Sequence, residues 1–300
     1  MIEKSRQKFS EEGIFWRQLY KQTSEILAEI NIERPEIEAR WIIEKASGYE
    51  GLEFVTGLDE RATVLGVKQL DAIIEKRRAG EPLQYALGSW GFRNLDLYLD
   101  KRVLIPRPET EILVDIAHEL LTNDEETTVK HIVDLGTGSG AIGLSIAQER
   151  ADVEVLLIDS SQEALKVTAA NVAGLGNHAK KIQILHGSWF AAIPEEYKKS
   201  FSLVVSNPPY ISLHEELPSD VIDWEPHSAL FAGEKGTEDI ELIINQARHW
   251  LHPNGALAIE MAPHQTKPNA LLASEIGYRD IKIHKDLAGK PRVMSCRWKL

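Results

Sequence analysis

Residues 206–210, Ser-Asn-Pro-Pro-Tyr, follow an apolar run at 201–205 and form the segment most suited to chemistry. A run rich in valine and leucine predicts a buried strand, and the two prolines end it because proline lacks a backbone N–H and has a fixed φ. The turn would hold Asn207 at the carboxyl end of the strand. Its side-chain carbonyl and the backbone carbonyl of Pro208 are two fixed acceptors, which suit a planar –NH2 group that has to be oriented. Tyr210 adds an aromatic face beside them.

A glycine-rich turn, Asp134-Leu-Gly-Thr-Gly-Ser-Gly140, follows a second apolar run and precedes a helical stretch at 142–148. Glycine lets the backbone turn tightly and approach a ligand closely. Asp159 ends the next predicted strand, where a carboxylate can accept both hydroxyls of a ribose. Together these features predict that a molecule with an adenosine ribose binds at the carboxyl edge of a sheet.

The glycine turn alone does not identify that molecule, because residues 138–143 also satisfy the dinucleotide pattern G-x-G-x-x-G. Two features favour S-adenosylmethionine. Asp134 stands inside the turn, where it would help to seat a cationic amino-acid portion but would sit poorly against a pyrophosphate. The Asn207 turn offers acceptors for an amine or amide, which hydride transfer does not need.

The bulk composition limits the classes of function. The chain has 300 residues, enough for one large or two ordinary domains, and a net charge of −12, which counts against a nucleic-acid partner. The single cysteine, Cys296, excludes an internal disulfide, and no pattern of ligands predicts a metal site. The first residues, Met1-Ile-Glu-Lys-Ser-Arg, lead into no apolar signal core, and no apolar window approaches about 18 residues. We therefore expect a cytoplasmic protein that does not bind membranes.

Apolar spacing predicts a helical bundle in residues 1–80, followed by a linker at 81–106. The helical stretches lie at 14–30, 36–43 and 64–74. In the linker, an alternating run at 95–100 and a short apolar run at 103–105 are interpreted as a β-hairpin that joins two domains.

Strands and helices alternate in the second domain, residues 107–300. Five apolar runs predict parallel strands, at 131–135, 154–158, 182–185, 203–205 and 256–260. Two alternating runs, at 280–284 and 292–298, predict an antiparallel hairpin at the sheet edge. The predicted fold class is α/β, with a seven-stranded, mostly parallel Rossmann-like sheet covered by helices on both faces.

The sequence resembles the release factor glutamine methyltransferases, the PrmC/HemK family. Asn-Pro-Pro-Tyr alone is shared with adenine-N6 and cytosine-N4 DNA methyltransferases and with other methylators of amides and amines. A series of motifs in family order, covering about residues 80–292, is more specific. The motifs are Gly80-Glu-Pro-Leu-Gln-Tyr85, Leu104-Ile-Pro-Arg-Pro-Glu-Thr-Glu111, Asp134-Leu-Gly-Thr-Gly-Ser-Gly140, Ser206-Asn-Pro-Pro-Tyr-Ile211, Trp224-Glu-Pro226 with Ala229-Leu230, and Lys285-Asp-Leu-Ala-Gly-Lys-Pro-Arg292.

The resemblance implies a class I S-adenosylmethionine-dependent methyltransferase that methylates a glutamine side-chain nitrogen, with S-adenosylhomocysteine as product. The substrate would be the Gly-Gly-Gln motif of class-I peptide chain release factors, docked by the N-terminal helical domain. The expected cofactor-binding residues are Asp134, Gly136, Thr137, Gly138, Ser139, Gly140, Asp159, Ser188, Trp189 and Asn207. The expected substrate-binding residues are Asn207, Pro208, Pro209 and Tyr210, of which Asn207, Pro208 and Tyr210 would be catalytic. Arg107 and Glu109 either cap a helix or line the substrate entrance between the domains.

Two positions depart from the family pattern. Ser188 precedes Trp189, where the family often has an acid that could accept from the adenine amino group. The serine would weaken that contact or replace it with its hydroxyl. Ala262 stands where the family usually has glycine, after Glu260 and an apolar residue. Neither change touches the expected reacting centre.

Three other functions use some of the same features. A DNA adenine-N6 methyltransferase would share the Asn207 turn, but the acidic charge and the absence of a basic recognition segment argue against it. A small-molecule methyltransferase is disfavoured by the extra helical domain. A binding module without activity is disfavoured because Asp159, Asn207 and the glycine turn are all present.

Overall fold

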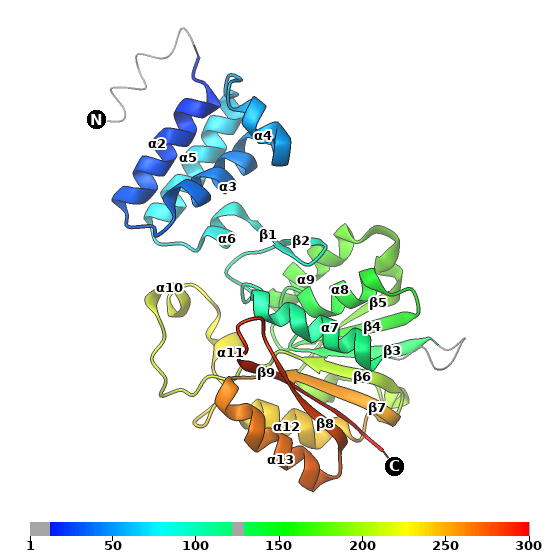
Figure 1. Ribbon diagram of the computed structural model, residues 1–300. Helices are drawn as coiled ribbons and strands as arrows, with labels where there is room; N and C mark the ends of the chain where they lie inside the picture. Colours follow the sequence, from blue (N-terminus) through cyan, green and yellow to red (C-terminus); the bar gives the residue numbers. More distant parts are fainter. Residues whose placement is uncertain (1–12, 122–128, 300) are drawn as a thin grey trace. The chain divides into compact units, whose positions relative to one another are not determined.

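The computed structural model describes residues 13–121 and 129–299 and divides into two compact units, Met1–Gly88 and Ser89–Leu300. Figure 1 shows both units in the colours of the sequence. The prediction for the N-terminal segment falls on residues 1–12 and lies outside the described residues. Within the described residues, no helix combines the length and the apolar character needed to cross a bilayer.

The first unit is helical, as predicted, and its helices pack around buried Trp16, Leu27, Ile42 and Leu70. Its helices are α2 (Trp16–Glu29), α3 (Pro35–Ser47), α4 (Gly51–Gly57), α5 (Val64–Arg78) and α6 (Leu83–Leu87). The sequence analysis missed α4 and α6 because helices this short show too little of the helical period.

The second unit contains a seven-stranded sheet in the order β5-β4-β3-β6-β7-β9-β8. The strands are β3 (Lys130–Leu135), β4 (Val153–Asp159), β5 (Ile182–His186), β6 (Phe201–Ser206), β7 (Leu251–Glu260), β8 (Arg279–Lys285) and β9 (Pro291–Arg297). Strands β3 to β7 pair in parallel, and β9 is antiparallel to both β7 and β8. The prediction of a mostly parallel sheet with an antiparallel C-terminal hairpin is therefore confirmed.

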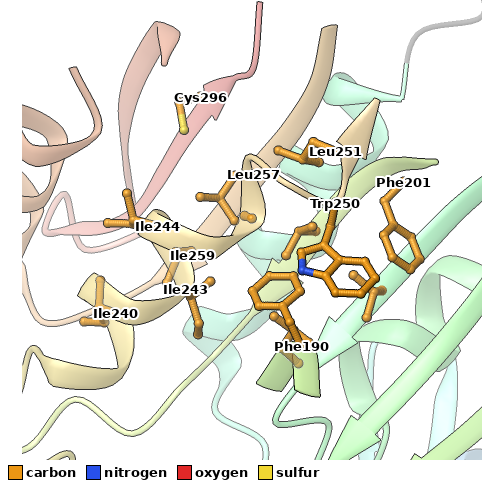
Figure 2. Packing of buried hydrophobic residues seen from close by; sticks show 14 of the residues in the cluster. Phe190, Phe201, Ile240, Ile243, Ile244, Trp250, Leu251, Leu257, Ile259 and Cys296 are labelled. Carbon is orange, nitrogen blue, oxygen red and sulfur yellow. The ribbon is translucent and has the colours of Figure 1, made fainter. Parts of the chain in front are cut away.

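Helices cover both faces of this sheet. On one face, α12 (Glu238–Ala247) and α13 (Thr266–Ile276) pack against each other and against the strands β7 to β9. On the other, α7 (Glu111–Leu120), α8 (Ala141–Glu149) and α9 (Gln162–Gly174) contact β3 to β7. Figure 2 shows the core under α12, where the rings of Phe190 and Trp250 stack with centroids 5.9 Å apart. This packing fixes the strands whose ends carry the predicted site.

Short elements complete the connections between strands and helices. They are η2 (Pro108–Thr110), η3 (Gly176–Lys181), η4 (Trp189–Ala192), η5 (Glu195–Tyr197), α10 (Ser219–Ile222), α11 (His227–Leu230) and η6 (Pro263–Gln265).

The predicted hairpin exists within residues 81–106, but one of its strands was assigned wrongly: the run at 95–100 contains an observed strand, and the run at 103–105 does not. The observed pair is β1 (Ser89–Phe92) with β2 (Leu95–Tyr98), joined by a tight turn in which Arg93 has a φ of 51°. Residues 103–105 form no strand, although Val103 and Ile105 are buried. These residues are apolar because they are buried, not because they belong to a strand. The backbone N–H of Ile105 donates to a side chain, Glu225 Oε2, at 3.1 Å.

Candidate active site

A cavity of about 300 Å³ lies at the carboxyl edge of the sheet in the second unit. Turns that follow the neighbouring strands β3, β4, β5 and β6 line it. The predicted residues among its lining are Gly136, Thr137, Gly138, Ser139, Asp159, Ser188, Trp189, Asn207 and Pro209. Residues from four separate segments of the chain thus line one cavity.

Asp134 is hydrogen-bonded to the glycine turn through Thr137 and does not line the cavity. It is fully buried, and its Oδ2 accepts from the Thr137 hydroxyl at 2.7 Å and from the Gly143 N–H at 3.0 Å. Its Oδ1 has no hydrogen-bond partner among the described residues. Because burial penalises the ionised form, the pKa of Asp134 is raised to about 6. The direct ligand contact predicted for Asp134 stays a prediction, while its support of the turn is observed.

Two side chains of α9 hold the same turn from the side. Thr168 donates its hydroxyl to the Gly138 carbonyl at 2.7 Å, and Asn171 donates to the Ser139 carbonyl at 2.8 Å. Asn171 also exchanges two hydrogen bonds with the backbone of Tyr98 in β2. The sequence analysis missed both residues, since a threonine and an asparagine within a helix carry no local signal of a distant contact.

Asp159 connects the glycine turn to the turn after β4. One carboxylate oxygen accepts from the Gly138 N–H at 2.9 Å and the other from the Ser161 N–H at 2.9 Å. Each oxygen keeps a second lone pair for a further donor. Burial raises the pKa of Asp159. A pair of neighbouring hydroxyls at this position would find two acceptors already oriented.

Trp189 lines the cavity and packs against the glycine turn. Its ring lies so close to Gly136 that a Cβ there would come within 3.3 Å of it. Trp189 has a φ of 48°, an unfavourable conformation for a bulky residue that persists only where other contacts hold it. One such contact is the approach of the indole N–H to the carboxylate of Asp239, which also lines the cavity. Burial raises the pKa of Asp239.

The Asn207 turn is held by side chains on either side of it. Ser206 donates its buried hydroxyl to the Leu135 carbonyl at 2.7 Å, and Gln265 donates to the Tyr210 carbonyl at 2.9 Å. Asn207 itself donates through Nδ2 to Thr110 Oγ1 at 3.3 Å. No donor among the described residues reaches Asn207 Oδ1, so this oxygen remains a free acceptor beside the cavity.

Several predicted residues lie outside the cavity lining. Tyr210 is half-buried against the hydrophobic core, and burial raises its pKa to about 12. Gly140 is buried at the start of α8 with a φ of 89°. The guanidinium of Arg107 pairs with the buried carboxylate of Glu225 at 2.5 Å, which ties two loops together. Pro208 and Glu109 are likewise absent from the lining.

The structure adds lining residues that the sequence analysis did not assign to the site. They include Arg102, Thr110, Ser160, Asp239, Pro226 and Ser228. Pro226 and Thr110 lie in motifs that were quoted for the family resemblance, which was the one signal available for them.

Two parts of the chain match known protein families. Residues 18–88 match the PrmC N-terminal domain and residues 111–222 match the methyltransferase small domain. The chain is 38% identical to the release factor glutamine methyltransferase of Coxiella burnetii, over 77% of this chain and 80% of that protein.

Two further comparisons concern length and fold. The chain is 32% identical to the bifunctional methyltransferase of Rickettsia typhi over 93% of this chain, and it spans about half, 56%, of that relative's length. The hMettl16 catalytic domain superposes with a TM-score of 0.54 at 13% identity, covering 78% of this chain and 81% of that one. The latter likeness concerns the fold alone.

The raised pKa of Asp134 predicts a distinct dependence of stability on pH. The ordinary pKa is 3.8 and the folded value is about 6, so the folded state binds this proton more tightly than the unfolded chain. The group therefore adds to the free energy of unfolding as the pH falls from 7 to 4, by about 2 kcal/mol. Urea unfolding of Asp134→Asn between pH 7 and 4 should lack this term, so the difference from the wild type should grow toward low pH.

Asp152 provides the matched control, because Arg150 lowers its pKa to about 2. The ionised Asp152 adds its full amount to the free energy of unfolding at pH values above 3.8, its pKa in the unfolded chain. Asp152→Asn should therefore lower the free energy of unfolding by a constant amount between pH 7 and about 4. A constant offset for Asp134→Asn as well would contradict the assignment.

Proposed function

Because this chain belongs to the release factor glutamine methyltransferase family, we propose that it methylates a release factor glutamine in the cytoplasm. The methyl group would pass from S-adenosylmethionine to N5 of the glutamine in the Gly-Gly-Gln motif of class-I peptide chain release factors. The observation that carries the proposal is the free Asn207 Oδ1, held at the cavity by a stiff turn. The family membership agrees with the resemblance seen in the motifs.

The residues around the cavity fit S-adenosylmethionine, which when bound supplies a methyl group on a sulfonium. Asp159 offers two oriented acceptors for a ribose diol. Gly138 has a φ of 56°, and a Cβ there would enter open space, so the turn leaves room beside its backbone. The cavity volume of about 300 Å³ lies at the lower end of the range for small-molecule sites. Trp189 supplies an aromatic wall for a planar base.

The chain's contribution to the chemistry is mainly orientation. An amide nitrogen is a poor nucleophile because its lone pair is delocalised into the carbonyl. Asn207 Oδ1 and the Pro208 carbonyl would each accept one N–H of the glutamine and hold its nitrogen in line for attack. As that nitrogen becomes positive, both hydrogen bonds strengthen, which stabilises the transition state more than the ground state. The amide then becomes acidic and its proton is lost to water without a dedicated strong base.

The N-terminal unit is proposed to dock the release factor. Its surface exposes large apolar side chains, with Leu52 92%, Val64 77% and Leu65 76% exposed. One glutamine offers little surface, and contacts remote from the reacting group can supply specificity.

The alternatives are less well supported. A DNA adenine-N6 methyltransferase is not favoured, given a net charge of −12 and relatives that carry the release factor name. A small-molecule methyltransferase would leave the match of residues 18–88 to the PrmC N-terminal domain unexplained.

The proposed function predicts one modified atom. Incubation of the protein with labelled S-adenosylmethionine and a recombinant class-I release factor should place one methyl group on the Gly-Gly-Gln glutamine. Peptide mapping by mass spectrometry identifies the residue. Label elsewhere in the release factor, or label taken up by DNA instead, would refute the proposal.

The orienting role of Asn207 predicts a selective loss of turnover. Replacing Asn207 by alanine removes one fixed acceptor, so kcat should fall by about 10²–10³ while the Kd for the cofactor stays near the wild-type value. Asn245→Ala is the matched control, because Asn245 is exposed on α12 and bonds only its own helix through Glu241. Near-normal turnover in Asn207→Ala would contradict the mechanism.

Asp239 is proposed to accept a hydrogen bond from the adenine amino group. Ser188, which stands where the family often has an acid, has no carboxylate to make this contact. In Asp239→Asn, the single side-chain oxygen must serve the Trp189 N–H, which leaves an –NH2 facing the adenine amino group. The Kd for S-adenosylhomocysteine, measured by calorimetry, should rise by about 10- to 100-fold. An N6-dimethyl analogue, which lacks the N–H donors, should bind the wild type and the variant more nearly alike. Equal losses for both ligands would exclude this role.

A further inference from the structure

Three polar side chains lie in series behind the proposed catalytic turn. Asn207 Nδ2 donates to Thr110 Oγ1 at 3.3 Å, and the Thr110 hydroxyl lies close enough to the carboxylate of Glu260 to favour its ionised form. Thr110 is 3% exposed and Glu260 1%. The three residues come from the turn after β6, from η2 and from the end of β7.

While Glu260 is ionised, the hydrogen bonds of this series can run in one donor-to-acceptor direction only. A carboxylate can only accept, so the single hydroxyl proton of Thr110 must go to Glu260. The Thr110 oxygen can then only accept, which requires the –NH2 side of the Asn207 amide to face it. The other side of that amide, Oδ1, is thereby kept as the free acceptor.

We propose that Thr110 and Glu260 are positioning residues that keep the Asn207 amide in the orientation that accepts from a substrate N–H. The inference rests on the proposed function, since an acceptor at Asn207 is what a glutamine amide requires. Without the series, the amide could turn by 180° at small cost and present two donors to the substrate. Two donors facing a substrate –NH2 would repel it.

Protonation of Glu260 would remove this control. Its second oxygen, Oε2, is buried without a hydrogen-bond partner among the described residues. Burial raises the pKa of Glu260 to about 7. A protonated Glu260 can donate to Thr110, whose hydroxyl proton is then free to donate to an inverted Asn207 amide. The productive orientation is therefore lost as the pH falls through the pKa of Glu260.

Charged and titratable groups around Glu260 affect this step. The cations Arg292 on β9 and Arg107 before η2 favour the ionised form, while Glu109 in η2 opposes it. Arg292 is partly neutralised by Asp286, whose carboxylate lies 3.2 Å from its Nε. Tyr210, whose own pKa is raised to about 12, stays neutral throughout the relevant range.

The first test reads the Asn207 amide directly and needs neither cofactor nor substrate. In protein labelled with ¹⁵N-asparagine, the side-chain –NH2 signals of Asn207 are assigned by their loss in Asn207→Ala. In the wild type they should shift with pH with a midpoint near 7, the pKa of Glu260. In Glu260→Gln and in Thr110→Val the shift should be absent. A wild-type signal that does not titrate between pH 5.5 and 8.5, or that titrates equally in Thr110→Val, would overturn the proposal.

The second test measures methylation of the release factor. Thr110→Val keeps the shape but removes the hydroxyl, so kcat should fall about 10- to 100-fold at unchanged cofactor Kd. Thr110→Ser restores the hydroxyl and should recover most of this loss, and Glu260→Gln should lose the acidic limb of the pH–rate profile. Thr23→Val is the control, because the buried Thr23 Oγ1 has no hydrogen-bond partner among the described residues.

The outcomes separate this inference from the proposed function. Equal losses in Thr110→Val and Thr110→Ser would refute the positioning role while the wild type still methylates the glutamine. A wild type that leaves the Gly-Gly-Gln glutamine unmodified would refute the proposed function, and the ¹⁵N titration would still decide whether Glu260 and Thr110 orient Asn207.

Discussion

The parallel pairing of β3 with β6 is the constraint on which the candidate site depends. Leu135 at the end of β3 pairs with Ser206 at the end of β6, and the Ser206 hydroxyl closes the pair by donating to the Leu135 carbonyl. The strand order reverses here, with β4 and β5 on one side and β7 on the other. Open α/β sheets form a crevice at such a point, because the chain leaves the two strands in opposite directions. The glycine turn and the Asn207 turn therefore share one edge although they are distant in the sequence.

Two buried carboxylates support these turns from behind. Asp134 lies beneath the glycine turn and Glu260 behind the Asn207 turn, and each has one oxygen without a hydrogen-bond partner among the described residues. A buried polar atom without a partner costs free energy. The cost is tolerable because the other oxygen fixes backbone or side chains that line the cavity. Rigid support of this kind holds binding groups in place before a ligand arrives.

The sequence was informative wherever short-range patterns determine structure. Apolar runs located all seven strands of the large sheet, and prolines and glycines located both turns of the site. The assignment of the second hairpin strand failed because the run at 103–105 is apolar through burial in an irregular segment. Thr168, Asn171 and Asp239 were missed because their partners are set by how α9 and α12 pack on the sheet. No local spacing encodes such a contact.

Ser188, where the resemblance leads one to expect an acid, shares the lining of the cavity with the carboxylate of Asp239. Ser188 is exposed on a loop, whereas Asp239 lies in the first turn of α12, where the helix dipole favours a negative charge. Trp189 connects the two positions, since it follows Ser188 and its indole N–H approaches the carboxylate of Asp239. That contact, with the packing of Trp189 on the core, offsets the unfavourable positive φ of this residue, about 1–3 kcal/mol. The carboxylate of Asp239 on the helix thus contacts the Trp189 indole and also lines the cavity.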